Sequence, residues 1–171
     1  VKGGGEISYT AHGRHSSKPV AVEVLDEPNE DLLNEVIAEH AAQLQLPTPH
    51  VLQNRVLRLT GGSRLNGRPW KAGVHCFFYL TTDRRIDARP RVSLVEFFIV
   101  TTIGRKEHVF VCLDERKVED RVLSIVVFDV FRPMRLRILH VEHLTHLVGS
   151  LPYWYNGRPD IRCGVPIAAT V

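Results

Sequence analysis

The feature that most constrains this fold is a series of short apolar runs, rich in Val, Ile, Phe and Leu, separated by turn-forming residues. The runs are residues 20–25, 51–59, 74–81, 92–102, 108–113, 122–131, 136–141 and 161–167. The turn signals are Gly61-Gly62, Asn66-Gly67, residues 87–90, Gly104, Arg132-Pro133 and Asn156-Gly157. Strands at such short intervals, without helices between them, predict antiparallel pairing in a barrel or a sandwich. Residues 92–100 are apolar at both odd and even positions, so both faces of a strand here would be apolar. This predicts a central strand that is covered on both faces.

One segment has a helical period instead. Asn29 is a suitable N-cap, and the acidic residues Glu30 and Asp31 after it favour the positive end of a helix dipole. Apolar residues then recur at helical spacing, at Leu32, Leu33, Val36, Ile37, Ala41 and Leu44. Pro47 and Pro49 are expected to end the helix. The sequence therefore predicts a mainly β, barrel-like antiparallel fold with at least one packed α-helix.

The length of 171 residues, with 44% apolar and 24% charged residues, is typical of one globular domain. We expect residues 1–18 to be a flexible lead-in and residues 19–171 to form a single β-rich domain. No apolar run approaches the ~18–20 residues of a membrane span, so a membrane partner is not predicted. Because the chain begins with Val1 and its single methionine is Met134, we expect a segment of a longer protein.

The chain has three cysteines, Cys76, Cys112 and Cys163, which lie far apart and mostly inside apolar runs. An odd number of cysteines cannot form a fully paired disulfide framework. This pattern predicts free thiols in an intracellular, reducing compartment.

The net charge of +3 conceals two oppositely charged segments. Residues 19–48 contain seven acidic residues and no Lys or Arg, whereas residues 55–91 contain nine basic residues against two aspartates. Two interpretations stay open: the segments pack together and neutralise each other, or they meet different partners.

The histidines suggest one possible metal site. His140, His143 and His146 are spaced by three, which would group them on a helix, and Cys163 is a possible fourth ligand. However, His140 ends a strand-like run, in which a spacing of three sends side chains to opposite faces. No CxxC or HExxH motif accompanies the histidines, so the sequence predicts no metal site and no cofactor.

Catalytic constellations are equally weak. A hydrolase would use His12 or His15 with Ser16 or Ser17, but there is no GxSxG nucleophile elbow. The glycines in residues 60–64 are followed by neither a helix nor the lysine of a phosphate-binding loop. We therefore expect no catalytic residues and no enzymatic activity.

Two sets of residues are candidates for binding instead. Basic residues in predicted loops form a candidate nucleic-acid surface: Arg64, Arg68, Lys71, Arg84, Arg85, Arg89 and Arg91. Aromatic residues near turns form a candidate peptide-binding wall: Tyr153, Trp154, Tyr155, Tyr79 and Trp70. The alternative for the cluster at 153–155 is that it fills the end of a barrel.

The order of motifs in the second half resembles the bromo-adjacent homology (BAH) family, particularly the divergent BAH-like segments attached to transposase-derived proteins. Four segments carry the resemblance: residues 95–100 (VEFFIV), 108–113 (HVFVCL), 126–133 (VVFDVFRP) and 138–153, which contains a Val-Gly dipeptide. The resemblance covers residues 71–167, and residues 19–49 are then an acidic extension that contains the helix.

The resemblance implies a nuclear, non-enzymatic interaction module with a β-barrel core. It would bind a histone tail, a nucleosome or another protein, including other parts of the parent protein, within a transposon-derived assembly. The basic loops support an alternative, a nucleic-acid-binding accessory domain with DNA as its partner.

Overall fold

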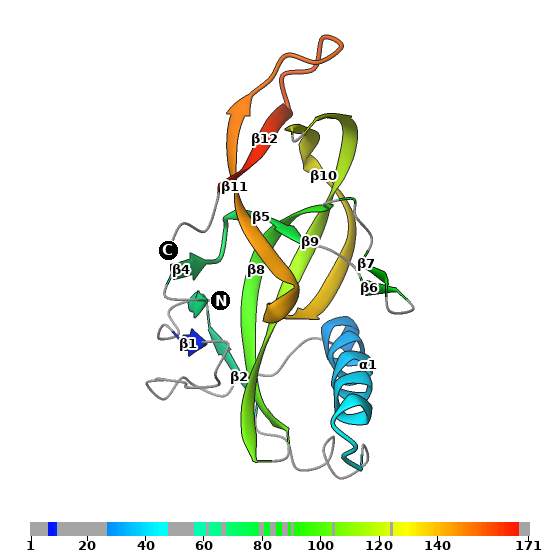
Figure 1. Ribbon diagram of the computed structural model, residues 1–171. Coiled ribbons are helices and arrows are strands. Elements are labelled where there is room, and N and C mark those ends of the chain that lie inside the picture. Colours follow the sequence, from blue (N-terminus) through cyan, green and yellow to red (C-terminus); the bar gives the residue numbers. More distant parts are fainter. Residues whose placement is uncertain are drawn as a thin grey trace. The chain divides into compact units, whose positions relative to one another are not determined.

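A computed structural model describes residues 7–9, 27–47, 57–60, 62–65, 68–78, 81–82, 85–86, 89, 91–103, 105–123 and 125–167. Its elements are β1 (Ile7–Tyr9), α1 (Glu27–Gln43), β2 (Leu57–Thr60), β3 (Gly62–Leu65), β4 (Arg68–Lys71), β5 (His75–Phe78), β6 (Thr81–Thr82), β7 (Arg85–Ile86), β8 (Arg91–Ile103), β9 (Lys106–Val122), β10 (Ile125–His140), η1 (Val141–His143), β11 (Leu144–Pro152) and β12 (Ile161–Ile167) (Figure 1). The strand predicted at 20–25 lies outside the described residues. So does the expected lead-in except for β1, which pairs in parallel with β3.

The chain divides into two compact units. Unit 1 comprises Val1–Ala72, Glu96–Leu113 and Arg137–Val141, and unit 2 comprises Gly73–Val95, Asp114–Leu136 and Glu142–Val171. The strands β8, β9 and β10 are long enough to contribute residues to both units.

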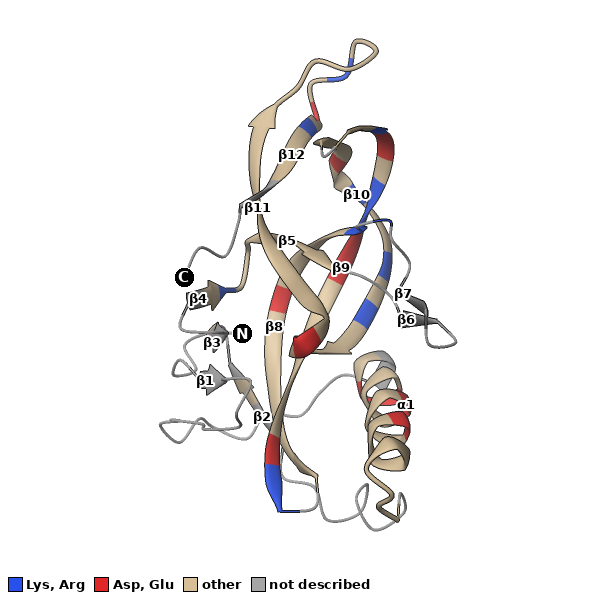
Figure 2. Ribbon diagram, viewed as in Figure 1, with Lys and Arg blue, Asp and Glu red and all other residues tan. Residues whose placement is uncertain are grey.

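The core of unit 1 forms where α1 packs against strands. Leu33, Ile37 and Ala41, at a spacing of four on α1, are fully buried. They join a cluster with Leu59, Ile99, Ile103, Phe110, Cys112 and Ile138. The opposite face of the helix exposes Asp31, Glu35 and Glu39, so this part of the acidic segment is a solvated stripe (Figure 2). The predicted packed helix is therefore confirmed.

Both ends of α1 differ in detail from the prediction. The helix begins at Glu27, two residues before the predicted N-cap Asn29. Pro28 is tolerated because it lies in the first turn. Asn29 consequently lies inside the first turn, where its side-chain oxygen accepts a hydrogen bond from the buried Cys112 thiol at 3.6 Å.

The carboxyl end of α1 is a Schellman motif. The Leu46 N–H donates to the Ala41 carbonyl at 2.9 Å, the Gln45 N–H donates to the Ala42 carbonyl at 3.1 Å, and Gln45 has a φ of 57°. Leu46 packs against the core cluster of unit 1. Leu44, predicted on the buried stripe, is 46% exposed because the chain leaves the helix at this point.

The strand pairings close on themselves. From β8 they run through β5, β11, β12, β10 and β9 and return to β8, which makes a ring of six strands (Figure 1). The registers within unit 2 are antiparallel, with β5 between β8 and β11, and β12 between β11 and β10. The mainly β, barrel-like antiparallel fold is therefore confirmed.

The core of unit 2 is formed by residues of β5, β8 and β10. Phe77, Val92, Val126 and Phe128 are buried together, and partly buried valines pack around them. On β8, both Val92 and Ser93 are fully buried, so its two faces are covered as the apolar run predicted.

The predicted break at Arg132-Pro133 was wrong, because β10 continues through it to His140. Residues 131–136 of β10 are exposed, where a proline can be tolerated. The N–H groups of Phe131 and Arg132 donate to Asp129 Oδ1 at 2.9 and 3.0 Å, so this side chain provides the acceptor. The strand β11, in the segment 138–153, was not among the predicted runs because its sequence is only weakly apolar.

Candidate binding surface of unit 2

Exposed hydrophobic side chains are concentrated in unit 2. Of the eleven large hydrophobic residues that are exposed among the described residues, only Leu44 belongs to unit 1. The other ten are Val122, Leu123, Ile125, Phe131, Met134, Leu136, Leu151, Tyr153, Trp154 and Val165. Because contiguous exposed apolar side chains mark interaction sites, unit 2 is the part of the chain in which to look for a binding surface.

The connection between β11 and β12 carries the aromatic cluster predicted from the sequence. Trp154 is 71% exposed and Tyr153 is 44% exposed, so these side chains do not fill the end of a barrel. Tyr155 is half-buried, and its ring centroid lies 6.2 Å from that of Tyr153.

A tight turn follows the cluster, as the Asn-Gly dipeptide predicted. Asn156 has a φ of 48° and Gly157 a φ of 74°, which is the left-handed pair of a type I′ turn. The Arg158 N–H donates to the Tyr155 carbonyl at 2.9 Å and closes the turn. This turn fixes the position of Arg158 relative to the aromatic residues.

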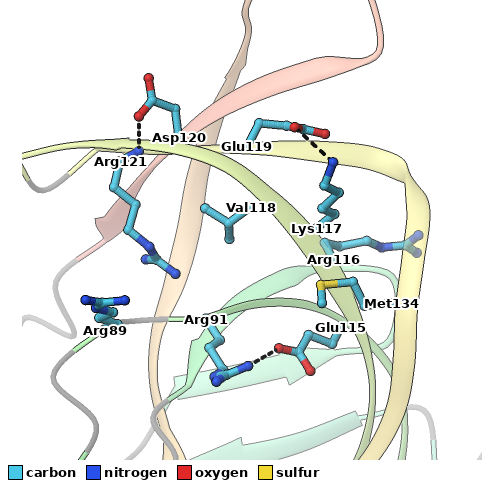
Figure 3. Close-up of a pocket in the computed structure, with 10 residues that line it drawn as sticks. All are labelled: Arg89, Arg91, Glu115, Arg116, Lys117, Val118, Glu119, Asp120, Arg121 and Met134. Carbon is cyan, nitrogen blue, oxygen red and sulfur yellow. Dashed lines mark hydrogen bonds and ion pairs between the residues drawn. The ribbon is translucent and has the colours of Figure 1, made fainter.

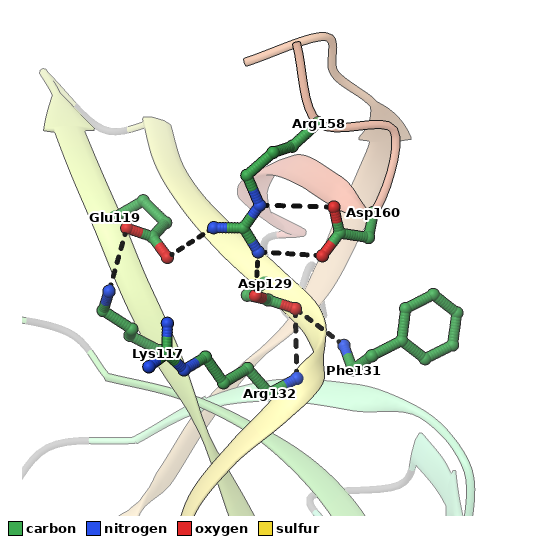
Figure 4. Close-up of polar contacts among 7 residues, drawn as sticks. All are labelled: Lys117, Glu119, Asp129, Phe131, Arg132, Arg158 and Asp160. Carbon is green, nitrogen blue, oxygen red and sulfur yellow. Dashed lines mark hydrogen bonds and ion pairs between the residues drawn. The ribbon is translucent and has the colours of Figure 1, made fainter. Parts of the chain in front are cut away.

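Arg158 fastens the connection to β9 and β10 (Figure 4). Its guanidinium Nη2 bonds Asp160 Oδ2 at 2.8 Å and also bonds Asp129 Oδ2, while Nη1 bonds Glu119 Oε1 at 3.2 Å. The side chain of Asp129 is only 2% exposed. Hydrogen bonds from Arg158 hold the pKa of Asp160 below its usual range, so Asp160 keeps its charge at neutral pH.

A second feature of unit 2 is a pocket of about 570 Å³ (Figure 3). Five basic and three acidic residues line it together with Val118 and Met134: Arg89, Arg91, Arg116, Lys117, Arg121, Glu115, Glu119 and Asp120. Two of the acids are already engaged by pairs of cations. Glu115 bonds Arg91 at 2.8 Å and Arg135 at 3.2 Å, and Glu119 bonds Lys117 and Arg158, both at 3.2 Å.

This excess of cations suits an anionic group. Arg116 pairs with Asp114 at 3.2 Å, and its buried Nε has no hydrogen-bond partner among the described residues. Phosphate and carboxylate groups are the ligands that several converging arginines prefer.

The structure brings together only part of the predicted basic surface. Arg89 and Arg91 line the pocket, whereas Lys71 is an exposed residue of unit 1. Arg64, Arg68 and Arg85 belong to strands, but their side chains, and all of Arg84, lie outside the described residues. Arg116, Lys117 and Arg121 were not among the predicted residues, because seven of residues 114–121 carry charges of both signs, a pattern typical of an ordinary solvated segment.

The other aromatic candidates are separate from the cluster. Trp70 on β4 belongs to unit 1 and is 5% exposed, so little of its ring can meet a ligand. Tyr79 lies outside the described residues, as do His12, His15, Ser16 and Ser17.

The three cysteines are free, with Cys76 and Cys112 buried and Cys163 half-buried. Burial raises the pKa of the Cys76 thiol, which keeps it protonated and unreactive at neutral pH.

The histidines group differently from their spacing in the sequence. Among the described residues, the three potential ligands that come close together are His40, His108 and His140. His143 lies on η1 and His146 on β11. The sequence did contain a signal for the observed group. His40 follows the buried Ile37 by three residues on α1, and His108 and His140 each lie two residues from a buried apolar residue of their own strand.

The described part of the chain contains no helix with the length and apolarity needed to cross a membrane. Comparisons with protein-family models, curated proteins and solved structures found no match to this chain. The resemblance to the BAH family therefore stays a prediction.

Proposed function

We propose that this domain is a non-catalytic protein-interaction module that binds its partner through the connection between β11 and β12. The observation that carries the proposal is Trp154, a large side chain that is 71% exposed on a connection fastened by Arg158. Tryptophan is among the residues that contribute most binding energy at protein interfaces. Because the connection is already held in place, less conformational entropy is lost on binding.

The chemistry of the cluster favours a partner with cationic side chains. Tyr153, Trp154 and Tyr155 offer aromatic faces, which attract ammonium, methylated ammonium and guanidinium groups. A histone tail is a basic peptide of this kind, and the BAH-like resemblance implies the same class of partner. Chromatin is therefore the first environment in which to look for binding.

A modified-histone peptide array, followed by nucleosome binding, tests the proposal. We expect Trp154→Ala to weaken binding at least about tenfold, because an anchor residue contributes ~2 kcal/mol or more. Phe131→Ala is the matched control, since Phe131 is an aromatic residue that is 76% exposed but lies on β10, outside the connection between β11 and β12. Arg158→Gln should also weaken binding by loosening the connection. The proposal fails if neither peptides nor nucleosomes bind at ~100 μM, or if Trp154→Ala binds like the wild type.

A second candidate function, nucleic-acid binding, is favoured by the cationic pocket. Phosphate contacts from Arg89, Arg116 and Arg121 would make affinity fall steeply with salt. Filter-binding titrations with duplex and single-stranded DNA at two salt concentrations decide the matter. Loss of salt dependence in an Arg89→Gln/Arg121→Gln double variant would support it, and salt-independent or absent binding would exclude it.

A further inference from the structure

Three histidines from three elements of unit 1 meet at one point. His40 lies in the last turn of α1, His108 on β9 and His140 at the end of β10. One ring nitrogen from each lies within 4.8 Å of the others. His108 Nδ1 and His140 Nε2 are 3.3 Å apart, while the His40 ring stacks on His140 at 4.8 Å with an interplanar angle of 10°.

The packing of unit 1 fixes these positions. His40 follows the buried Ile37 by three residues, which places it on the core side of α1. His108 alternates with the buried Phe110 and Cys112 on β9, and His140 alternates with the buried Ile138 on β10. All three side chains therefore point the same way as the core residues of their own elements.

The three histidines lie beside an aromatic ring and are partly shielded from water. Phe110 contacts the group edge-on, with its ring centroid 5.3 Å from that of His140 and 6.1 Å from that of His40. His140 is 3% exposed, whereas His40 and His108 are half-buried. A charged ligand bound here would be shielded from water on the Phe110 side.

We propose that His40, His108 and His140 bind one Zn²⁺ ion. Zinc is held by imidazole nitrogens at about 2.0–2.1 Å, which in a tetrahedral site places the nitrogens about 3.3 Å apart. The His108–His140 pair already has this separation. The His40 nitrogen, which lies within 4.8 Å of the other two, must come closer, and its ring, nearly parallel to that of His140, must turn so that both nitrogens face one ion. A water molecule completes the four ligands, as in other three-histidine zinc sites.

Zinc at this point would join α1 to β9 and β10. Because an ion that binds only the folded state stabilises it, the thermal midpoint should rise with zinc concentration. At a zinc concentration 100-fold above Kd, the expected rise is about 5–10 °C for a protein of this size. This effect needs neither the partner nor the surface of unit 2, so it is independent of the proposed function.

The test uses the whole chain, stripped of metal with a chelator and titrated with Zn²⁺ alone. Isothermal calorimetry should give one ion per chain with a Kd of ~1 μM or tighter, and Co²⁺ should give the visible absorption of a tetrahedral site. His40→Ala should weaken zinc binding at least ~100-fold, because loss even of a group that only supports a ligand costs about 10–100-fold. His143→Ala is the matched control and should bind like the wild type.

His40→Ala is the decisive variant because His40 is half-buried and alanine favours a helix. His108→Ala provides the second variant, and circular dichroism shows that each remains folded. The proposal is overturned if the wild type does not bind zinc below ~100 μM. It is also overturned if folded His40→Ala and His108→Ala bind zinc as tightly as the wild type, or if His143→Ala alone abolishes binding.

Discussion

His75, at the start of β5, is placed where its charged form is disfavoured. Burial lowers its pKa to about 4, and the positive charges of Arg116 and Arg162 act in the same direction. Its Nε2 atom is buried without a hydrogen-bond partner among the described residues, and its ring packs 5.2 Å from Phe128. The ring is therefore neutral at physiological pH.

The lowered pKa of His75 predicts that the folded protein becomes less stable in acid. Unfolded chains take up a proton at His75 below a pH of about 6.5, whereas the folded protein does so only near 4. Stability should therefore fall as the pH drops from about 6.5 to about 4, by about 1–2 kcal/mol after allowance for solvent screening. Urea unfolding at pH 7.5 and pH 5 measures the difference.

His75→Gln should reduce this pH dependence, since the variant removes the titrating group. Val165→Ala, at an exposed residue of unit 2 that has no titratable side chain, should leave it unchanged. An equal loss of stability at pH 5 in the wild type and in His75→Gln would contradict the assignment.

At the scale of elements, the packing around β12 leaves no room for a side chain at Gly164. A Cβ atom there would lie 2.5 Å from Val148 Cγ1 and 3.0 Å from Phe128 Cε1. Val148 is β-branched and stiff, and Phe128 is fully buried, so neither can move away easily. β12 can therefore approach β10 and β11 only because this residue is a glycine.

Gly164→Ala should destabilise the protein by about 1–3 kcal/mol, the usual cost of overpacking a core. Denaturant unfolding measures the change. Val165→Ala, at the neighbouring residue that is 44% exposed, is the control and should change stability by no more than about 0.5 kcal/mol. If Gly164→Ala unfolds at the same denaturant concentration as the wild type, the strands can move apart at no cost in free energy, and the prediction is contradicted.

The elements also show what local sequence can predict. The period of Leu33, Ile37 and Ala41 depends only on neighbours within α1, and it gave the helix correctly. The continuation of β10 through Pro133 depends on its exposure and on acceptors from Asp129, which no local pattern contains. Helix ends and strand breaks are therefore less predictable than the elements themselves.

At the scale of the whole molecule, the least predictable features join distant parts of the chain. The pocket combines Arg91 on β8 with Arg116 and Lys117 on β9, and the histidine group combines residues from α1, β9 and β10. The spacing of His140, His143 and His146 suggested a different group, because sequence distance does not report strand pairing. The strand pairings of the ring and the packing of α1 determine which side chains meet.

The ring predicts that its last two strands are indispensable. Deletion of residues 144–171 would remove β11 and β12, which leaves β5 paired only with β8, and β10 only with β9, among the ring strands. Exposed strand edges promote association, so the shortened chain should aggregate. Light scattering, compared with the intact chain at equal concentration, measures this. A shortened chain that stays monomeric with wild-type circular dichroism would contradict the prediction.

The strand order also has a consequence during synthesis. β5 ends at Phe78 and its partner β11 begins at Leu144, so about 65 residues must be added before the two can pair. At about 5–20 residues per second, translation of that interval takes roughly 3–13 s. During those seconds one edge of β5 has no partner strand, although its residues Phe77 and Phe78 are buried in the finished protein.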